Sequence, residues 1–248
     1  MNHPKRGTAV IFNHVNFSLP ECSKRDGSDK DRDALTDVLH ELDFDVIVHN
    51  DLTANEVLDV LVTVSQMDHT DADCLVIAVM SHGDDGKVYA RDRDYPTKTL
   101  WKYFNACICP SLAGKPKLFF VQACRGRGLH SSQTLRYKPE TDGYSDDAYY
   151  SIPIMADILV MYSTVDGFYS WRDPSSGGYF IQSLVKQLRL HHETKDLLTI
   201  LTFVNREVAV DFTSYEPKNP KFSGRKQMCS IVSMLTRLLY FTNNKTIT

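Results

Sequence analysis

Unbroken apolar runs constrain the fold of this chain more than any other feature. Residues 74–80 read CLVIAVM, and two later runs, KLFFV at 117–121 and ILVMY at 158–162, are nearly as apolar. A strand with one face in water alternates apolar and polar side chains, whereas a strand of a parallel sheet covered on both faces needs no alternation. The runs therefore predict strands at the centre of a buried, mainly parallel sheet.

Segments with helical spacing of apolar residues separate these strands. Helices are predicted at 28–42, 53–64, 100–106, 180–190 and 197–210. Shorter strands are predicted at 8–12, 44–49 and about 230–239. The first two helices open with apparent capping boxes, at 28–31 and 53–56. Alternating strands and helices predict an α/β fold, with helices on both faces of a mostly parallel central sheet and ligands beyond the carboxyl ends of its strands.

The charge balance excludes several classes of partner. The 248 residues suffice for one domain, and the 31 acidic and 28 basic residues form no long run of either sign. A nucleic-acid footprint or a patch for anionic membranes is therefore not predicted. We expect proteins or peptides as partners.

The cysteines and the N-terminus bear on the compartment. The charged N-terminus has no apolar run behind it that would suit a signal peptide, and no stretch of about 18 apolar residues could span a membrane, so a cytoplasmic protein is expected. Six cysteines in a chain without a secretion signal are expected to be reduced thiols. The closest pair, Cys107 and Cys109, lacks the spacing of a zinc site, and no metal is predicted.

A histidine and a cysteine follow two of the predicted central strands. His82 and Gly83 come just after the run at 74–80, and Cys124 comes just after the run at 117–121, so both side chains are expected at the same sheet edge. An imidazole with a reference pKa of about 6.5 can take the proton of a thiol near neutral pH. The amides of Gly83 and Cys124 could then bind an oxyanion. Either residue alone would more often be structural, because cysteine is a commonly buried residue type.

A long segment without apolar periodicity interrupts the pattern at 125–151. It is rich in Gly, Ser, Asp, Thr and Tyr, and loops of this length inside a domain are usually functional or disordered.

The pentapeptide QACRG at 122–126, with SHG upstream at 81–83, resembles the signature of the caspase family of aspartate-specific cysteine peptidases. The similarity spans almost the whole chain, and it is strongest to executioner caspases, particularly those of insects. Its other segments are FNH at 12–14, RDG at 25–27, PSLAGKPKLFF at 110–120, YSTVDGFYSWRD at 162–173 and SMLTR at 233–237. The resemblance implies the caspase-like three-layer sandwich and a thiol protease without a metal or organic cofactor.

Within this resemblance, His82 and Cys124 match the catalytic pair, and the amides of Gly83 and Cys124 match the oxyanion donors. Arg25, Gln122 and Arg172 match the pocket for the substrate aspartate. Guanidinium groups suit this role because they stay charged and bind a carboxylate in a fork geometry.

The resemblance also implies the subsites beside that pocket. Tyr169 and Trp171 match aromatic walls, whereas Ser170 and Arg172 match positions whose backbone pairs with an extended substrate. Asp173 departs from the family because executioner caspases usually have asparagine there. A second carboxylate should weaken the preference for an acidic residue four positions upstream of the cut, unless basic side chains offset it. The candidates for that offset are Lys218, Lys221 and Arg225.

Caspases are zymogens, so the segment at 125–151 is expected to be a processed linker. The sequence ETDG at 140–143 resembles a cut site, which predicts cleavage after Asp142, with Asp147 as a second choice. The large subunit would then be 1–142 and the small subunit 143–248. The alternative is an acidic loop with incidental aspartates.

The family resemblance further predicts an apoptotic executioner with several protein partners. The chain begins close to the first predicted strand, so no recruitment domain is expected and an upstream caspase would activate it. Val232 and Met234 match the family's dimer interface, which implies a homodimer. Inhibitor-of-apoptosis-type proteins are possible cleft ligands.

Two alternatives compete with an active executioner. A catalytically silent caspase-like regulator would dimerise with active caspases, but such proteins usually lack a catalytic residue, and both catalytic positions are intact here. A legumain-like or metacaspase-like peptidase would share the His-Gly and Ala-Cys pattern but would not need both pocket arginines, Arg25 and Arg172.

Overall fold

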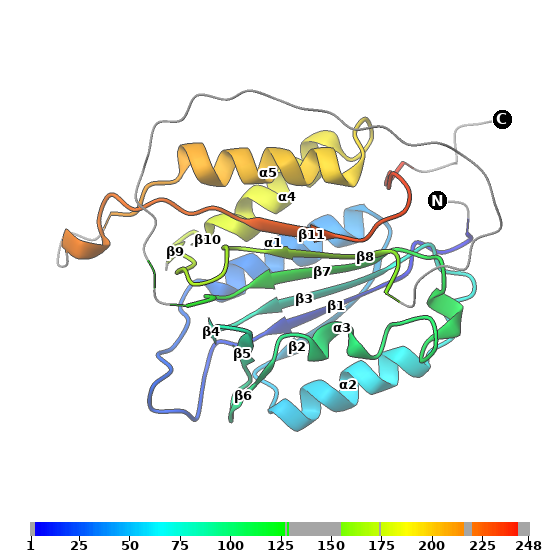
Figure 1. The fold of residues 1–248 in the computed structure, drawn as a ribbon, viewed down its shortest axis with the longest axis horizontal. Coiled ribbons are helices and arrows are strands. Elements are labelled where there is room, and N and C mark those ends of the chain that lie inside the picture. Colours follow the sequence, from blue (N-terminus) through cyan, green and yellow to red (C-terminus); the bar gives the residue numbers. More distant parts are fainter. Residues whose placement is uncertain (1–2, 127, 129–154, 174, 216–219, 243–248) are drawn as a thin grey trace.

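The computed structural model describes residues 3–126, 128, 155–173, 175–215 and 220–242. Its centre is a six-stranded sheet with the strand order β11-β8-β7-β3-β1-β2 (Figure 1). All neighbouring strands are parallel except β11, which runs antiparallel to β8. The strands are β1 (Thr8–Asn13), β2 (Asp45–Asn50), β3 (Leu75–Met80), β7 (Lys117–Gln122), β8 (Ile158–Tyr162) and β11 (Ser230–Ser233).

Helices cover both faces of this sheet (Figure 1). One face carries α1 (Ser28–Glu41), α4 (Tyr179–His191) and α5 (Leu197–Asp211), and the other carries α2 (Ala54–Gln66) and α3 (Thr99–Lys102). Strand β3 shows why its sequence needs no alternation, because Val76 and Ala78 pack into one core while Leu75 and Ile77 pack into the other. The predicted three-layer α/β sandwich is confirmed.

Short elements complete the molecule. A small sheet comprises β4 (Gly83–Asp84), β5 (Lys87–Tyr89) and β6 (Asp94–Pro96), and a two-stranded ribbon comprises β9 (Arg172–Asp173) and β10 (Gly177–Gly178). Two 3-10 turns, Pro110–Leu112 and Pro220–Phe222, lie in connections. None of these was predicted, because two or three residues are too few to show a period.

The two predicted capping boxes have different outcomes. At α2, Glu56 N donates to Thr53 Oγ1 (3.3 Å) and Thr53 N donates to the Glu56 carboxylate (2.7 Å), as predicted. At α1 the prediction was wrong, since the N-cap is Gly27 with φ 84° and no side chain caps the helix. The Ser28 hydroxyl instead donates to Asn13 Oδ1 (2.7 Å), and Asp31 binds the ribbon strand β10.

The observed ends of the elements differ most from the predicted ends near the C-terminus. The last strand ends at Ser233 and does not continue to 239, because Asp157 Oδ1 accepts hydrogen bonds from the backbone (3.0 Å) and hydroxyl (2.7 Å) of Thr236 and turns the chain away from the sheet. Helix α3 is also shorter than predicted and ends at Lys102. Among the described residues, no helix has the length and apolar character needed to cross a membrane.

Candidate active site

His82 and Cys124 lie at the carboxyl edge of the sheet, as the sequence predicts. Strands β3 and β7 pair in register at Met80 and Gln122, so each side chain follows its strand end by two residues. Gly83 packs closely against Ala123 and Cys124. A Cβ at Gly83 would lie 2.4 Å from Cys124 O and 2.9 Å from the Ala123 Cβ. This close approach leaves room only for glycine.

The His82 ring is oriented by a backbone carbonyl. Its Nε2 lies 2.7 Å from Ser23 O, and because a carbonyl only accepts, the proton resides on Nε2 and leaves Nδ1 as a free acceptor. The ring packs against Phe17 with 4.9 Å between ring centroids. Burial lowers the pKa of His82, as do Arg25 and Arg172, although the Ser23 bond opposes this. The imidazole is therefore neutral at pH 7 and able to take a proton.

The Cys124 thiol faces the loop that precedes β9. Ser170 N donates to Sγ (3.4 Å), and Sγ lies 3.7 Å from Ser170 O. Burial raises the pKa of Cys124, while the Ser170 amide and the guanidiniums of Arg25 and Arg172 act in the opposite direction. The sulfur is thus protonated at rest, and it needs a base to become a nucleophile.

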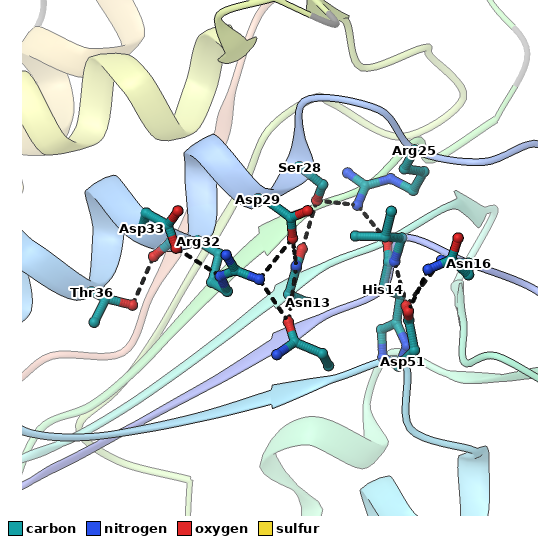
Figure 2. Close-up of polar contacts among 12 residues, drawn as sticks. Asn13, His14, Asn16, Arg25, Ser28, Asp29, Arg32, Asp33, Thr36 and Asp51 are labelled. Carbon is teal, nitrogen blue, oxygen red and sulfur yellow. Dashed lines mark hydrogen bonds and ion pairs between the residues drawn. The ribbon is translucent and has the colours of Figure 1, made fainter.

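Arg25 is one of the largest fully buried side chains, at 2% exposure. Its Nη1 donates to His14 O (2.9 Å) and Ser28 Oγ (2.7 Å) (Figure 2). The Ser28 hydroxyl in turn donates to Asn13 Oδ1. Burial lowers the pKa of Arg25 to about 9, and the nearby charge of Arg172 also acts to lower it. The side chain remains cationic at neutral pH, and its position is fixed by its neighbours.

Gln122 and Arg172 are the other two residues predicted for the aspartate pocket. Gln122 Nε2 donates to Ser170 Oγ (2.8 Å), and its buried Oε1 has no hydrogen-bond partner among the described residues. The Arg172 guanidinium is half-buried, and its Nε donates to Asp26 O (2.8 Å). Burial lowers the pKa of Arg172, whereas Asp31 and Cys124 raise it. Two cations and one amide therefore gather close to the thiol.

An aromatic cluster adjoins this group. The Tyr169 ring lies 5.8 Å from Phe222, and the Trp171 ring lies 6.1 Å from both Phe212 and Phe222. The Tyr179 ring is 4.3 Å from Phe212. The structure thus places the two predicted aromatic residues together and adds three others that the sequence analysis did not assign to the site.

Asp173 binds its own turn. Its Oδ1 accepts from Ser175 N (2.6 Å) and Ser176 N (3.0 Å), and these hydrogen bonds lower the pKa of the carboxyl. Among the described residues, no ion pair joins Asp173 to a cation. Arg225 Nε donates to Lys221 O (2.8 Å).

The Caspase domain family profile matches residues 6–240, which is nearly the whole chain. The chain belongs to the caspase family. Caspase drICE of Drosophila melanogaster is 45% identical over 246 residues, 99% of this chain and 72% of that protein. Caspase-1 of Spodoptera frugiperda is 46% identical over 241 residues, 97% of this chain and 80% of that protein. A crystal structure of that Spodoptera caspase has a TM-score of 0.91 at 44% identity, over 98% of this chain and 94% of the other.

These matches confirm the predicted family, its similarity to insect caspases and the caspase fold. A caspase is a cysteine-type endopeptidase specific for aspartate, and this is the activity of the chain.

Sequence reasoning missed several residues of this caspase site. Ser23 orients His82 through a backbone carbonyl, which carries no side-chain signal. Phe212 and Phe222 lie in a connection after α5, where aromatic residues in a polar stretch were the available clue. Gln227 accepts from Trp171 N (2.8 Å) and donates to Ser163 O (2.8 Å), and no sequence pattern marks it.

All six cysteines are free of disulfides in the structure. Over the described ranges, no group of three or more His, Cys, Asp or Glu side chains could hold a metal ion. Asp142, Asp147 and Lys218 lie outside the described residues.

Proposed function

We propose that this caspase is an executioner of apoptosis in which Cys124 is the nucleophile and His82 the base. The observation that carries the proposal is the gathering of Arg25, Arg172 and Gln122 beside a thiol and a neutral imidazole at one sheet edge. His82 Nδ1 takes the Sγ proton, and the thiolate attacks the carbonyl carbon after the substrate aspartate. The amides of Gly83 and Cys124 hold the resulting oxyanion.

The second half of the reaction returns the proton. His82 donates it to the leaving amine as the C–N bond breaks, which leaves a thioester on Cys124. Water then attacks this thioester with His82 again as base, and the thiol is released with the new carboxyl product. The proposed cycle uses no metal or organic cofactor.

The proposed aspartate pocket is supported by charge and geometry. Arg25 and Arg172 stay cationic at neutral pH, and the buried Gln122 amide adds polar groups at the same place. A carboxylate matches guanidinium forks, whereas a neutral Asn side chain does not. The backbone of Ser170 and Arg172 would pair with the extended substrate, with Tyr169 and Trp171 as walls.

Activation is proposed to require a cut in the linker 125–151, after Asp142 or Asp147, by an upstream caspase. The products would be a large subunit, 1–142, and a small subunit, 143–248. The proposal is supported by hydrogen bonds between the start of the linker and the loop after β8. Gly167 N donates to Arg125 O (2.6 Å), and Tyr169 N donates to Gly128 O (3.0 Å). Cleavage would therefore leave β7 and β8 paired in the sheet.

A homodimer of cleaved protomers is proposed through β11. This strand is the end of the sheet order, and Val232 on it is 46% exposed. The outer edge of such a terminal strand has backbone groups that can pair with another chain. We propose the cytoplasm as the compartment, and inhibitor-of-apoptosis-type proteins as possible ligands of the cleft.

The test is hydrolysis of fluorogenic tetrapeptides that end in Asp, Glu or Asn by purified, linker-cleaved protein. Turnover should be confined to Asp and should be lost in Cys124→Ala and Arg172→Ala. Absence of turnover after forced cleavage at Asp142 would contradict the proposal and favour the silent regulator.

A further inference from the structure

A buried carboxylate on α1 lies under the proposed aspartate pocket and has no part in the reaction above. Asp31 is 0% exposed. Its two oxygens accept from Gly178 N at 2.9 and 2.7 Å, and its Oδ1 also accepts from Gln182 Nε2 at 2.7 Å. Within the described part of the chain Asp31 forms no ion pair, and burying a carboxylate without one is costly.

The contacts of Asp31 lead directly to a pocket residue. Gly178 is in β10, which pairs with β9 so that Gly178 lies opposite Arg172. The approach is close: a Cβ at Gly177 would lie 2.2 Å from Asp31 Oδ1, and a Cβ at Gly178 would lie 3.0 Å from both Asp31 Oδ2 and the Gln122 Cδ. The two glycines therefore let the carboxylate reach the ribbon that carries Arg172.

Asp31 also acts on both pocket cations through space. It raises the pKa of Arg25 and of Arg172, opposing the desolvation that lowers both. Burial raises the pKa of the Asp31 carboxyl to about 6, whereas its hydrogen bonds to Gln182 and Gly178 and the two guanidiniums act to lower it.

We propose that Asp31 is a positioning residue of the aspartate pocket. Its hydrogen bonds link β10 to α1, so that the paired strand β9 holds Arg172 in place, and its negative charge balances the two arginines. This inference rests on the pocket assigned above. It also joins the proposed subunits, because Asp31 belongs to the large one and Gly178 and Gln182 to the small one.

Three variants separate the fastening from the charge. Asp31→Ala removes both, whereas Asp31→Asn removes the charge and one of the two acceptor oxygens but keeps an oxygen acceptor for Gly178 N. Asp37→Asn is the matched control, since Asp37 is an exposed carboxylate on the same helix.

Steady-state kinetics with an Asp tetrapeptide is the main measurement. Asp31→Ala should raise KM by at least about tenfold, the size expected for loss of a hydrogen bond to a charged group. Its kcat should change by less than about threefold, because β3 and β7 hold His82 and Cys124 independently of the ribbon. Asp31→Asn should have a KM no higher than that of the wild type.

The pH dependence of KM tests the charge of Asp31, because a residue with only a structural role would not change this dependence. A substrate carboxylate repels ionised Asp31, so KM of the wild type should increase as the pH rises through about 6, and this increase should be missing from the profile of Asp31→Asn. The charged groups that face Asp31 are Arg25 and Arg172, which stay cationic in this range, and its other neighbours are neutral amides. His82 and Cys124 titrate in both proteins, so the difference between the two profiles isolates Asp31.

Amide hydrogen exchange of Gly177 and Gly178 separates this inference from the proposed function. Faster exchange in Asp31→Ala than in Asp37→Asn supports the fastening, even if the protein cleaves no peptide. The proposal would be overturned by equal exchange in these two variants, by a KM of Asp31→Ala equal to that of the wild type, or by parallel pH profiles for the wild type and Asp31→Asn. If Asp31→Ala does not fold, the KM profile of Asp31→Asn decides.

Discussion

The catalytic pair and the aspartate pocket are built by different means. His82 and Cys124 follow two central strands whose residues are buried throughout, and Gly83 packs directly on the cysteine backbone. The pocket arginines instead come from a loop and from β9 of the two-stranded ribbon, and hydrogen bonds to Ser28 and Asp26 hold them. Asp31 binds the ribbon at Gly178, and only Gln122 of the pocket belongs to a central strand, β7. The sheet therefore supplies the geometry of the chemistry, while polar contacts between loops supply the specificity. Mutations in the first region should act on kcat, and mutations in the second should act on KM.

The largest effect is expected for Gly83→Ala, because the added Cβ would lie 2.4 Å from Cys124 O. The backbone must shift, and one oxyanion donor moves out of place. We expect kcat to fall by about a hundredfold or more with little change in KM. Steady-state kinetics tests this, with Gly86→Ala as control, since a Cβ there meets nothing within 4 Å although its φ of 67° makes the change mildly strained. An increase in KM with unchanged kcat would contradict the division between the two regions.

The pocket arginines should differ from each other. Arg25 is fully buried and bonded to His14 O and Ser28, so Arg25→Ala should lower stability by about 1–3 kcal/mol and also raise KM. Arg172 is half-buried, so Arg172→Lys should raise KM for Asp peptides by about tenfold or more with little effect on Tm, because an ammonium cannot replace the guanidinium fork. Thermal unfolding and kinetics measured on the same samples would show whether the two effects separate.

The pH dependence of kcat should report His82 in the catalytic region. Burial lowers the pKa of this imidazole below 6.5, so its neutral, proton-accepting form persists to lower pH. With saturating substrate, kcat should therefore be half-maximal below pH 6.5. Phe17→Ala exposes the ring and should shift this midpoint upward, by up to about 1 pH unit. A midpoint that does not move would mean that Phe17 does not control the solvation of His82.

The same contrast explains what the sequence could predict. The central strands are recognisable because full burial removes their alternation, and the positions of His82 and Cys124 follow from where those strands end. The pocket does not follow from any period: Arg25, Arg172 and Gln122 were assigned only through family resemblance. The false capping box at Ser28 has the same origin, because both of its polar residues are engaged by distant partners, Asn13 and Gly178. Short-range patterns cannot show contacts between loops that are far apart in the chain.

Asp173 offers the smallest and sharpest test of the pocket region. Its carboxylate is ionised and bound to the turn at Ser175 and Ser176, so it should repel an acidic residue four positions upstream of the cut. An asparagine side chain in its place could still accept these backbone hydrogen bonds through its amide oxygen, but it would carry no charge. Asp173→Asn should therefore increase kcat/KM for DxxD over VxxD peptides by about twofold to fivefold, as expected for an exposed charge. The effect should shrink at high salt, and an unchanged ratio would show that the turn, not its charge, sets this preference.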